Sequence, residues 1–571
     1  MCNDQKGGPG PPTLMAVIYL NPEAFDTTKA ALMGRHSAGE GFLQGYLRHA
    51  RTEQLHFWNV AGEKPAVLEA FLERFDVAGR PVTWIGQHDL GRLGQGGIVQ
   101  IPSPRIAEQS WLRRSHGAAS YGVTGITHTT ATSRIMESLA HTLLSPVQPW
   151  DAIICTSRAV RSSVTALLDA TSDHLRAHLG ASRIRPPRLE TIPLGIDTSA
   201  FTPDPDQRRA WRDKLGIPDD AVVALYVGRF SLTSKMNPVP MAMALERTAQ
   251  RTGRPIHWVL SGWANGEKNE KRFHDFTRAH CPSVGYHIVD GRKADARYSI
   301  WSVGDLFISL SDNIQETFGL TPVEAMAAGL PSVISDWNGY KETVRHNVDG
   351  FRISSYTPRA GRGLDLALKF AAEWDSYEAY VGQVSQFTAI DLDEATDALC
   401  ALVDDAELRA RMGEAARLRA SEVFDWKAVI PMYEALWGEL DATRQRAAAE
   451  AAPQRNTAEN PWALDPFRLF GSYPTEWLTA HTMVALAPGL DADSAALILR
   501  KPMVAAGQLV LPTADDTRAI LKFLGERRQC RVHEVVEQFP FARRASAERG
   551  LVWLAKYGVV KILGRSTEIV D

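Results

Sequence analysis

The stretch SDNIQETFGLTPVEAMAAGLPSVI, residues 311–334, decides the predicted fold. An apolar strand, Leu306 to Leu310, comes before it, and a second apolar strand, Ser332 to Ser335, ends it. A polar loop with Glu316 and a short helix with Glu324 lie between them, so the stretch is one strand–helix–strand unit of a parallel sheet. Ligands of such sheets bind at the carboxyl ends of the strands. We therefore expect Glu316 and Glu324 to face the same crevice.

One of these two carboxylates has a local structural explanation. Thr321, Pro322 and Glu324 match a capping box, with Thr321 as the N-cap and Glu324 reaching back to its amide. No capping or pairing rule accounts for Glu316. The amides of 317–320 precede the helix start, where the helix dipole and free N–H groups favour an anion such as phosphate. A capping role for Glu324 and an anion site beside Glu316 are both open.

The same residues resemble the signature of a known family. Glu316, Phe318-Gly319-Leu320, Glu324-Ala325-Met326-Ala327 and the Gly-Leu-Pro that follows are similar to the Glu-x7-Glu motif of family-four retaining glycosyltransferases (glycosyl transferases group 1). The resemblance implies the α/β GT-B fold, in which two Rossmann-like doubly wound domains face each other across a cleft. It implies a nucleotide-sugar donor held by Glu316, Thr317, Phe318, Gly319 and Leu320, with Glu324 on the ribose.

Composition sets broad limits on the protein. The 571 residues suggest three or four domains at roughly 150 residues each. Hydrophobic residues at 44% and charged residues at 23% are ordinary for a globular protein, and a net charge of −3 gives no general attraction to nucleic acid or anionic membranes. Five scattered cysteines fit neither a disulfide framework nor a zinc ribbon. No apolar run suits a signal peptide or a spanning helix, so we expect a cytoplasmic protein with at most peripheral membrane contact.

The first part of the chain alternates buried strands with amphipathic helices, which is typical of a doubly wound domain, here 14–195. A Gly/Pro-rich leader, 1–13, is expected to be disordered. A glycine-bearing loop at 33–42 would let Gly39 and Gly41 bring the backbone close to a donor phosphate, with a plain turn as the alternative. This loop also resembles the family's glycine loop. We expect strands at 14–22, 54–60, 81–86, 97–102, 121–130, 152–157 and 189–197, and a helix at 66–75.

Three histidines merit comment. His128 ends a strand and precedes a helix, and its surroundings, GITHTTATSR, resemble the family's strand-end His-Thr. The resemblance implies that its imidazole faces the donor sugar across the cleft; a structural histidine is the alternative. His174 and His178 have the i, i+4 spacing of zinc ligands, but the glutamate of HExxH is missing and charges surround them. We interpret them as a solvated helix face.

The second lobe, 196–425, follows ETIPLGIDTSAF (190–201), which resembles the family's crossing between lobes. Gly228 and Arg229 follow its first strand, and Lys235 comes six residues after Arg229. Cations beside a departing diphosphate favour the transition state over the ground state. The resemblance implies this role for Arg229 and Lys235. Without the resemblance, the two residues could equally be surface cations at the end of a strand. Further strands are expected at 257–263, 286–291 and 306–311, and helices at 267–279, 294–300 and 394–420. The segment 289–293 matches the base-binding loop of the family, and 358–390 is an insertion without a motif.

The end of the chain departs from the family pattern. Helices at 426–446 are expected to cross back onto the first lobe, and a polar linker, 447–461, follows. Helices at 517–525, 532–539 and 542–557 and a strand at 559–563 resemble a winged helix within the accessory module 462–571. From 461 on, 14 Lys/Arg stand against 12 Asp/Glu, so we expect a docking or self-association module and not a nucleic-acid site.

The sequence thus predicts an enzyme that moves a sugar from a nucleotide diphosphate sugar to an unidentified acceptor: a glycan, lipid, protein or small metabolite. The resemblance implies Glu316, His128, Arg229 and Lys235 as its catalytic residues. Asp391-Leu-Asp393 and Asp491-Ala-Asp493 have the Asp-x-Asp form of metal-dependent sugar transferases, but neither follows a buried strand, so we interpret both as helix-flanking carboxylates and expect no metal or cofactor. The alternatives are an epimerase or phosphorylase of the same fold and a non-catalytic nucleotide-sugar sensor.

Overall fold

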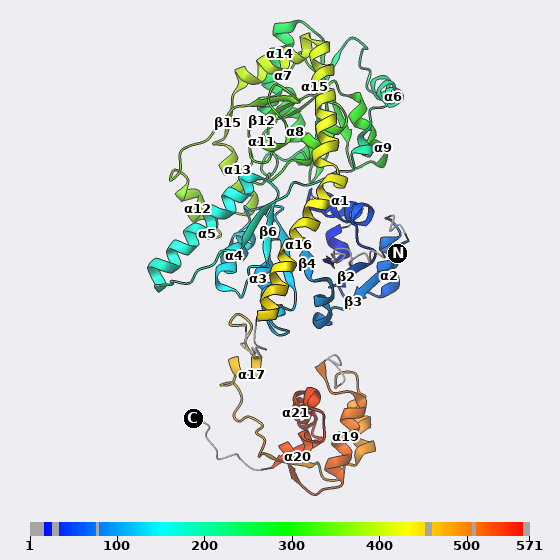
Figure 1. The fold of residues 1–571 in the computed structure, drawn as a ribbon, viewed down its shortest axis with the longest axis vertical. Helices are drawn as coiled ribbons and strands as arrows, with labels where there is room; N and C mark the ends of the chain where they lie inside the picture. Colours follow the sequence, from blue (N-terminus) through cyan, green and yellow to red (C-terminus); the bar gives the residue numbers. More distant parts are fainter. Residues whose placement is uncertain (1–15, 26–33, 76–78, 451–459, 505–509, 564–571) are drawn as a thin grey trace, which may run out of the picture. The chain divides into compact units, whose positions relative to one another are not determined.

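The computed structural model describes residues 16–25, 34–75, 79–450, 460–504 and 510–563 (Figure 1). The chain divides into two units, Met1–Thr457 and Ala458–Asp571. The leader, 1–13, lies outside the described residues, so its expected disorder stays a prediction.

The first lobe of the larger unit is built on a seven-stranded parallel sheet in the order β3-β2-β1-β4-β5-β6-β7. The chain runs from β1 out to β3, returns to β4 beside β1 and continues to β7, which makes the sheet doubly wound. Its strands are β1 (Ala16–Leu20), β2 (Leu55–Asn59), β3 (Val82–Ile85), β4 (Ile98–Ile101), β5 (Gly122–Ile126), β6 (Ala152–Cys155) and β7 (Arg188–Thr191). Its helices are η1 (Pro22–Phe25), α1 (Gly34–His49), α2 (Pro65–Leu72), η2 (Leu90–Gly96), α3 (Ile106–Arg114), α4 (Ser133–His141), η3 (Thr142–Leu144) and α5 (Arg158–Leu179).

The second lobe repeats this plan with six parallel strands in the order β10-β9-β8-β11-β12-β13. The strands are β8 (Val222–Val227), β9 (Ile256–Gly262), β10 (Gly285–Asp290), β11 (Leu306–Ser309), β12 (Ser332–Ser335) and β13 (Gly350–Ile353), with a small antiparallel pair, β14 (Ser355–Tyr356) and β15 (Ala389–Ile390). The helices are η4 (Thr198–Phe201), α6 (Pro205–Leu215), α7 (Val239–Thr252), α8 (Glu267–Arg278), α9 (Ala294–Arg297), η5 (Ser299–Val303), α10 (Leu320–Ala327), α11 (Tyr340–Thr343), α12 (Leu364–Ala371), α13 (Tyr377–Ser385), α14 (Leu392–Asp404), α15 (Ala406–Arg419), η6 (Ala420–Phe424) and α16 (Trp426–Glu450). The two doubly wound α/β lobes confirm the predicted fold class.

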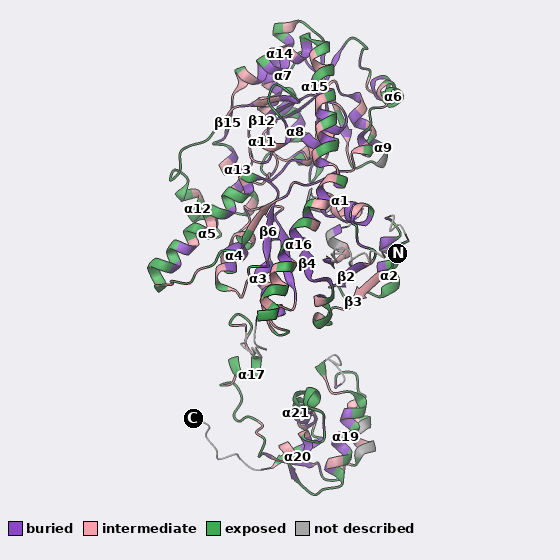
Figure 2. Ribbon diagram, viewed as in Figure 1, coloured by how far each residue is buried: buried purple, intermediate pink, exposed green. Residues whose placement is uncertain are grey.

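The inner strands of both sheets are buried and the edge strands β3, β7 and β10 are partly exposed, while the covering helices are buried on one side and exposed on the other (Figure 2). This is the pattern expected when helices cover both faces of a parallel sheet. None of the described helices is long and apolar enough to cross a membrane.

Two chain segments connect the lobes, and they are hydrogen-bonded to each other. The Ile196 amide donates to the Phe424 carbonyl at 2.8 Å, and the Trp426 amide donates to the Ile196 carbonyl at 3.1 Å. After this crossing α16 runs along the first lobe and packs against α1, β4 and β5 (Figure 1).

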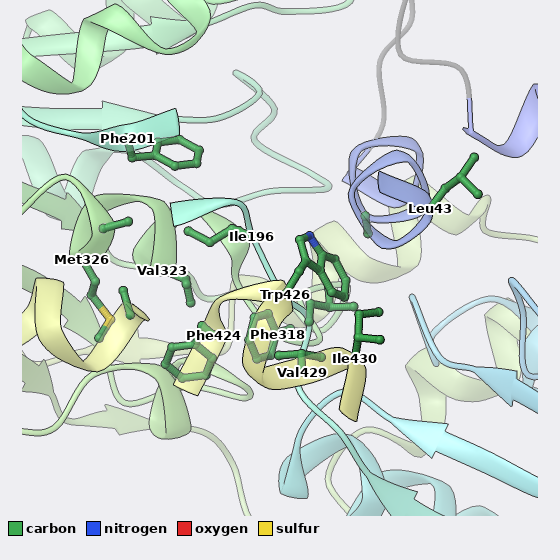
Figure 3. Packing of buried hydrophobic residues seen from close by; sticks show 14 of the residues in the cluster. Leu43, Ile196, Phe201, Phe318, Val323, Met326, Phe424, Trp426, Val429 and Ile430 are labelled. Carbon is green, nitrogen blue, oxygen red and sulfur yellow. The ribbon is translucent and has the colours of Figure 1, made fainter. Parts of the chain in front are cut away.

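Trp426 is the centre of the junction between the lobes (Figure 3). Its side chain is 2% exposed and lies against α1, where a Cβ added to Gly45 would be 2.4 Å from the indole Cγ. On the other side of the junction, Phe318 of the signature loop packs edge-on against Phe424, with 5.9 Å between ring centroids. The signature loop is therefore anchored to the same apolar cluster that joins the lobes.

The predicted glycine loop at 33–42 is wrong from residue 34 onward. Helix α1 begins at Gly34, so Gly39 and Gly41 lie inside it. The physical reason is the packing of α1 against Trp426. A Cβ on Gly45 would be 2.4 Å from the indole Cγ, so glycine is needed there, whereas a Cβ on Gly41 would make an ordinary contact of 3.4 Å with Nε1. The spacing of the glycines alone did not distinguish a packed helix from a loop.

Two further local predictions are corrected. Helix α10 begins at Leu320 with Gly319 as its N-cap, so Thr321 lies inside the helix and the capping box is wrong. Gly319 has φ +94°, and a Cβ there would lie 2.2 Å from the Tyr340 ring, so only glycine fits this entry. The predicted linker 447–461 begins too early, because α16 continues to Glu450 through residues with high helix propensity.

The smaller unit contains a three-stranded antiparallel sheet in the order β17-β16-β18. Its elements are α17 (Pro466–Leu469), β16 (Met483–Leu486), α18 (Ala492–Leu499), α19 (Ala514–Gly525), β17 (Cys530–Arg531), α20 (Val532–Val536), α21 (Phe541–Lys556) and β18 (Val560–Leu563). Ile520, Val535, Leu551 and Leu554 are buried in its core. The three expected helices and the final strand are present within three residues of their predicted ends, and the winged-helix identity stays a prediction.

Candidate active site

A cavity of about 930 Å³ lies between the two lobes, where strands of both sheets end. It brings together residues that are far apart in the sequence. The predicted site residues that line it are Gly41, His128, Arg229, Lys235, Glu316, Thr317, Phe318, Gly319, Leu320 and Glu324. Gly39 does not line it; this residue borders a separate space of about 20 Å³.

A partly buried ion pair lies in the wall of this cavity. The Lys235 Nζ atom donates to Glu316 Oε2 at 2.8 Å, and the two side chains are 18% and 14% exposed. Burial by itself would lower the pKa of Lys235, but the Glu316 carboxylate together with Tyr340 and Tyr226 outweighs burial and raises that pKa above its usual value. Burial would likewise raise the pKa of Glu316, but Lys235 and the amides of Thr317 and Phe318 hold it below its usual value. Both groups are therefore charged at neutral pH.

The backbone around Glu316 is fixed by hydrogen bonds within the second lobe. The Asn338 amide nitrogen donates to the Glu316 carbonyl, and the Trp337 indole donates to the Asn313 carbonyl at 3.0 Å. Because the loop then enters α10 at Gly319, its amides lie at the start of a buried helix. This is the arrangement in which backbone N–H groups bind an anion.

The first lobe contacts the same loop through Thr317. Its carbonyl accepts a hydrogen bond from Ser157 Oγ at 2.9 Å, and its hydroxyl donates to the His128 carbonyl at 3.4 Å. Ser157 follows β6 and His128 follows β5, so two strand ends of the first lobe touch the signature loop. The lobes are therefore closed on each other at this point, with the His128 side chain in the cavity.

Arg229 reaches the cavity from the end of β8 and is contacted by Gln315. We assign the Gln315 amide from its hydrogen-bond network, because only one orientation satisfies both of its ends. In that orientation Oε1 accepts from Arg229 Nη2 at 3.2 Å, while Nε2 donates to the Ser234 carbonyl at 3.0 Å and to the Tyr377 hydroxyl at 3.2 Å. The guanidinium is thus held by an uncharged group.

Aromatic and basic side chains also line the cavity. Trp263 follows β9, and the Arg292 guanidinium lies 5.8 Å from the centroid of its ring. Arg292 is also bound to both oxygens of Asp290, at 2.9 and 3.0 Å. Arg297 lines the cavity as well and forms an ion pair with Glu40 of α1 at 3.6 Å, which is a further contact between the lobes.

Glu324 lies on α10 and lines the cavity near these cations. Burial raises its pKa from an ordinary 4.5 to about 7, and the charges of Arg297 and Lys235 oppose that rise only in part. At neutral pH the group is therefore divided between its protonated and ionised forms. A protonated carboxyl donates one hydrogen bond and an ionised one only accepts, so both forms suit a hydroxylated ligand.

Glu324→Gln is expected to change how stability depends on pH. A raised folded-state pKa means that the wild type is stabilised below pH 4.5 and loses this contribution as pH rises toward and through about 7. The glutamine variant has no such proton to lose, so it should gain stability relative to wild type between pH 5 and pH 8. Thermal unfolding at both pH values measures this. Glu439→Gln, on the surface, is the control and should show no pH-dependent difference, and equal behaviour of the two variants would contradict the prediction.

Part of the second lobe matches a known domain family. Residues 207–369, which include Arg229, Lys235, Glu316 and Glu324, match the family model described as glycosyl transferases group 1. This stretch is a glycosyl transferases group 1 domain.

Curated proteins are similar to part of this chain. A D-inositol 3-phosphate glycosyltransferase from Xylanimonas cellulosilytica is 26% identical over 215 residues, which are 37% of this chain and 46% of the relative. A protein of the same name from Jonesia denitrificans is 30% identical over 190 residues, 32% of this chain and 44% of the relative. The chain thus spans about half the length of these curated relatives. Among solved structures, sucrose-phosphate synthase from Thermosynechococcus elongatus is 15% identical with a TM-score of 0.48, over 75% of this chain and all of that one.

Four of the residues that line the cavity between the lobes deserve mention because the sequence did not predict them. Trp263 directly follows β9, so the strand-end rule would have found it. Gln315 directly precedes Glu316 and had no motif of its own. Arg297 and Tyr377 come from a short helix and from the insertion 358–390, and only the folded chain brings them to the cavity.

The remaining candidates lie away from the cavity. His174 and His178 are exposed on α5 with stacked rings, which confirms the predicted helix face. Asp391 accepts hydrogen bonds from the amides of Asp393 and Glu394 at the start of α14, and Asp491 caps α18 in the same way. Both Asp-x-Asp pairs therefore begin helices, as expected. Among the described residues, no group of three or more His, Cys, Asp or Glu could hold a metal ion.

Proposed function

We propose that this chain transfers a sugar from a nucleotide diphosphate sugar to an acceptor hydroxyl, with retention of configuration at the anomeric carbon. The carrying observation is the Lys235–Glu316 ion pair at 2.8 Å in the wall of a cavity that also contains Arg229 and the start of α10. Two cations and a row of backbone amides around one space suit a diphosphate. The family match supports this reading and the resemblance supplies the retaining outcome.

Each residue then has a role in the proposed reaction. The bond between the anomeric carbon and the diphosphate oxygen breaks, and the diphosphate leaves with the electron pair. The acceptor oxygen bonds to the carbon, and the acceptor's hydroxyl proton passes to the departing diphosphate oxygen. Arg229 and Lys235 stabilise the negative charge that grows on the leaving group. Glu316 orients Lys235 and accepts hydrogen bonds from the sugar, His128 contacts the sugar from the first lobe, and Glu324 holds the ribose.

The nucleotide base is proposed to lie at the far end of the cavity, beside Trp263 and Arg292. An aromatic ring with a guanidinium over it offers a stacking surface to any base. The acceptor would enter from the first lobe, near His128. The name of the curated relatives makes a phosphorylated cyclitol a reasonable first acceptor to test.

The proposed function is tested with the full chain and a panel of UDP-, GDP-, ADP- and dTDP-sugars, with release of the nucleoside diphosphate as the measurement. We expect one donor to react, and to react faster with inositol phosphates or with a fraction of cell extract as acceptor. Conversion of the donor without an acceptor would indicate an epimerase, and a requirement for inorganic phosphate would indicate a phosphorylase. Binding of a donor without any turnover would support the non-catalytic sensor.

We propose a docking or self-association role for the smaller unit. The segment after the linker exposes several large apolar side chains, and exposed aromatic clusters of this kind are common in interaction surfaces. These are Trp462 at 61%, Phe467 at 69%, Tyr473 at 80% and Trp477 at 61% exposure.

A further inference from the structure

The insertion 358–390 folds into two helices that carry a tyrosine into the cavity. Phe370 of α12 stacks on Tyr380 of α13, with 4.3 Å between parallel rings, and this joins the two helices. Ser376 caps α13 by accepting a hydrogen bond from the Ala379 amide at 3.2 Å, so Tyr377 is the first residue of the helix. Tyr377 lines the same cavity as Arg229 and Glu316.

Helix α13 is seated on the loop that carries Arg229 and Lys235. The Asn313 amide nitrogen donates to the Thr233 carbonyl at 2.7 Å and to the Val381 carbonyl at 3.4 Å, which ties α13 to the loop. A Cβ on Gly382 would lie 3.1 Å from Thr233, so helix and loop are in close contact. The place of Tyr377 is therefore fixed relative to the two cations.

A chain of hydrogen bonds runs from Tyr377 to Arg229. The tyrosine hydroxyl accepts a hydrogen bond from Gln315 Nε2 at 3.2 Å, and Gln315 Oε1 accepts from Arg229 Nη2 at 3.2 Å. Thr129, next to His128 on the first lobe, lies near the tyrosine hydroxyl and lines the same cavity. One end of the chain therefore lies beside the first lobe, and the other is a guanidinium at the proposed diphosphate site.

The two cations of this site, Lys235 and Arg229, have partners of different charge. Lys235 is neutralised by Glu316, whereas Gln315 orients Arg229 without cancelling its charge. Arg229 therefore carries the net positive charge of the three ionised side chains. A side chain that is held in place before the ligand arrives loses less conformational entropy on binding, so orienting this guanidinium should strengthen diphosphate binding.

We propose that Tyr377 and Gln315 are positioning residues that hold the Arg229 guanidinium toward the donor diphosphate. The insertion thus supplies a residue that orients the guanidinium at the proposed diphosphate site. This inference rests on the proposed function, since it needs a diphosphate in the cavity.

Tyr377→Phe tests the proposal by removing only the hydroxyl. UDP, GDP and ADP are titrated into the full chain by calorimetry, and the tightest ligand of the wild type is used for the variants. Loss of the hydrogen-bonded hydroxyl should weaken its binding about three- to tenfold. Tyr380→Phe, the same change in the same helix but outside the cavity, is the matched control and should bind as the wild type does. The donor kcat/KM should fall in parallel for Tyr377→Phe alone.

A double-mutant cycle with Gln315→Leu separates positioning from a direct contact. If Tyr377 acts through Gln315, Tyr377→Phe should have no further effect in the Gln315→Leu background. Fully additive effects would overturn the proposal, as would binding by Tyr377→Phe equal to that of Tyr380→Phe. If Tyr377→Phe fails to fold, normal binding by Gln315→Leu would overturn it. A wild type that binds none of the three nucleotides would instead overturn the proposed function, and this inference with it.

Discussion

Glu316→Gln is expected to lower turnover of the nucleotide sugar on the order of a hundredfold or more. The substitution keeps the size of the side chain but removes the charge that pairs with Lys235 at 2.8 Å. Lys235 is then no longer held in one position, and the sugar loses an ionised acceptor for its hydroxyl groups. Release of the nucleoside diphosphate at saturating donor measures the effect.

The control for this variant is Glu439→Gln, which changes an exposed carboxylate on α16 that pairs with Arg188. It should leave turnover unchanged. If Glu316→Gln turned over the donor as fast as the control, Glu316 would have no part in the reaction and its ion pair would be structural.

Lys235→Met is expected to destabilise the larger unit by about 3–5 kcal/mol, because it leaves the buried Glu316 carboxylate without its cation. Without Lys235, burial becomes the dominant influence and the pKa of Glu316 should rise. In the wild type the lowered pKa of Glu316 contributes stability at neutral pH that is lost as pH falls through the folded-state value. The variant should therefore differ most from wild type at neutral and alkaline pH, and least in acid. Unfolding followed across this pH range measures the difference.

The double variant Lys235→Met with Glu316→Gln separates stability from activity. It has no unpaired charge at this place, so it should recover most of the stability that Lys235→Met loses. Sugar transfer should remain as low as in either single variant, because both proposed roles are missing. A double variant less stable than Lys235→Met would contradict the assignment of the lost stability to an unpaired carboxylate.

The sequence was most informative where a strand ends. Arg229 and Glu316 each follow a buried strand, and the rule that strand ends meet at one edge of a parallel sheet was enough to place them together. His128 was placed by the same rule on the first sheet. That these residues share one cavity also required the two lobes to face each other, and this expectation came from the resemblance to a family.

The sequence was least informative where packing decides the local structure. Gly39 and Gly41 looked like a loop because the packing of their helix against the Trp426 indole, which Gly41 contacts, depends on a residue nearly four hundred positions away. Thr321 looked like an N-cap because nothing local indicates that Tyr340 closes over Gly319. No sequence pattern pointed to Tyr377, because its position in the cavity depends on how α13 packs on a loop of the second lobe.

The hydrogen-bonded pair of segments at Ile196 and Asp425 has a mechanical consequence. Two strands tied side by side resist twisting more than a single strand does, so we expect swinging of the lobes about one axis and little rotation of one against the other. A swing that separates the lobes would break the hydrogen bonds between Thr317 of the signature loop and Ser157 and His128 of the first lobe. Opening of the lobes to admit a substrate would therefore release the backbone around Thr317, and its hydrogen bonds to the first lobe would form again only when the lobes close.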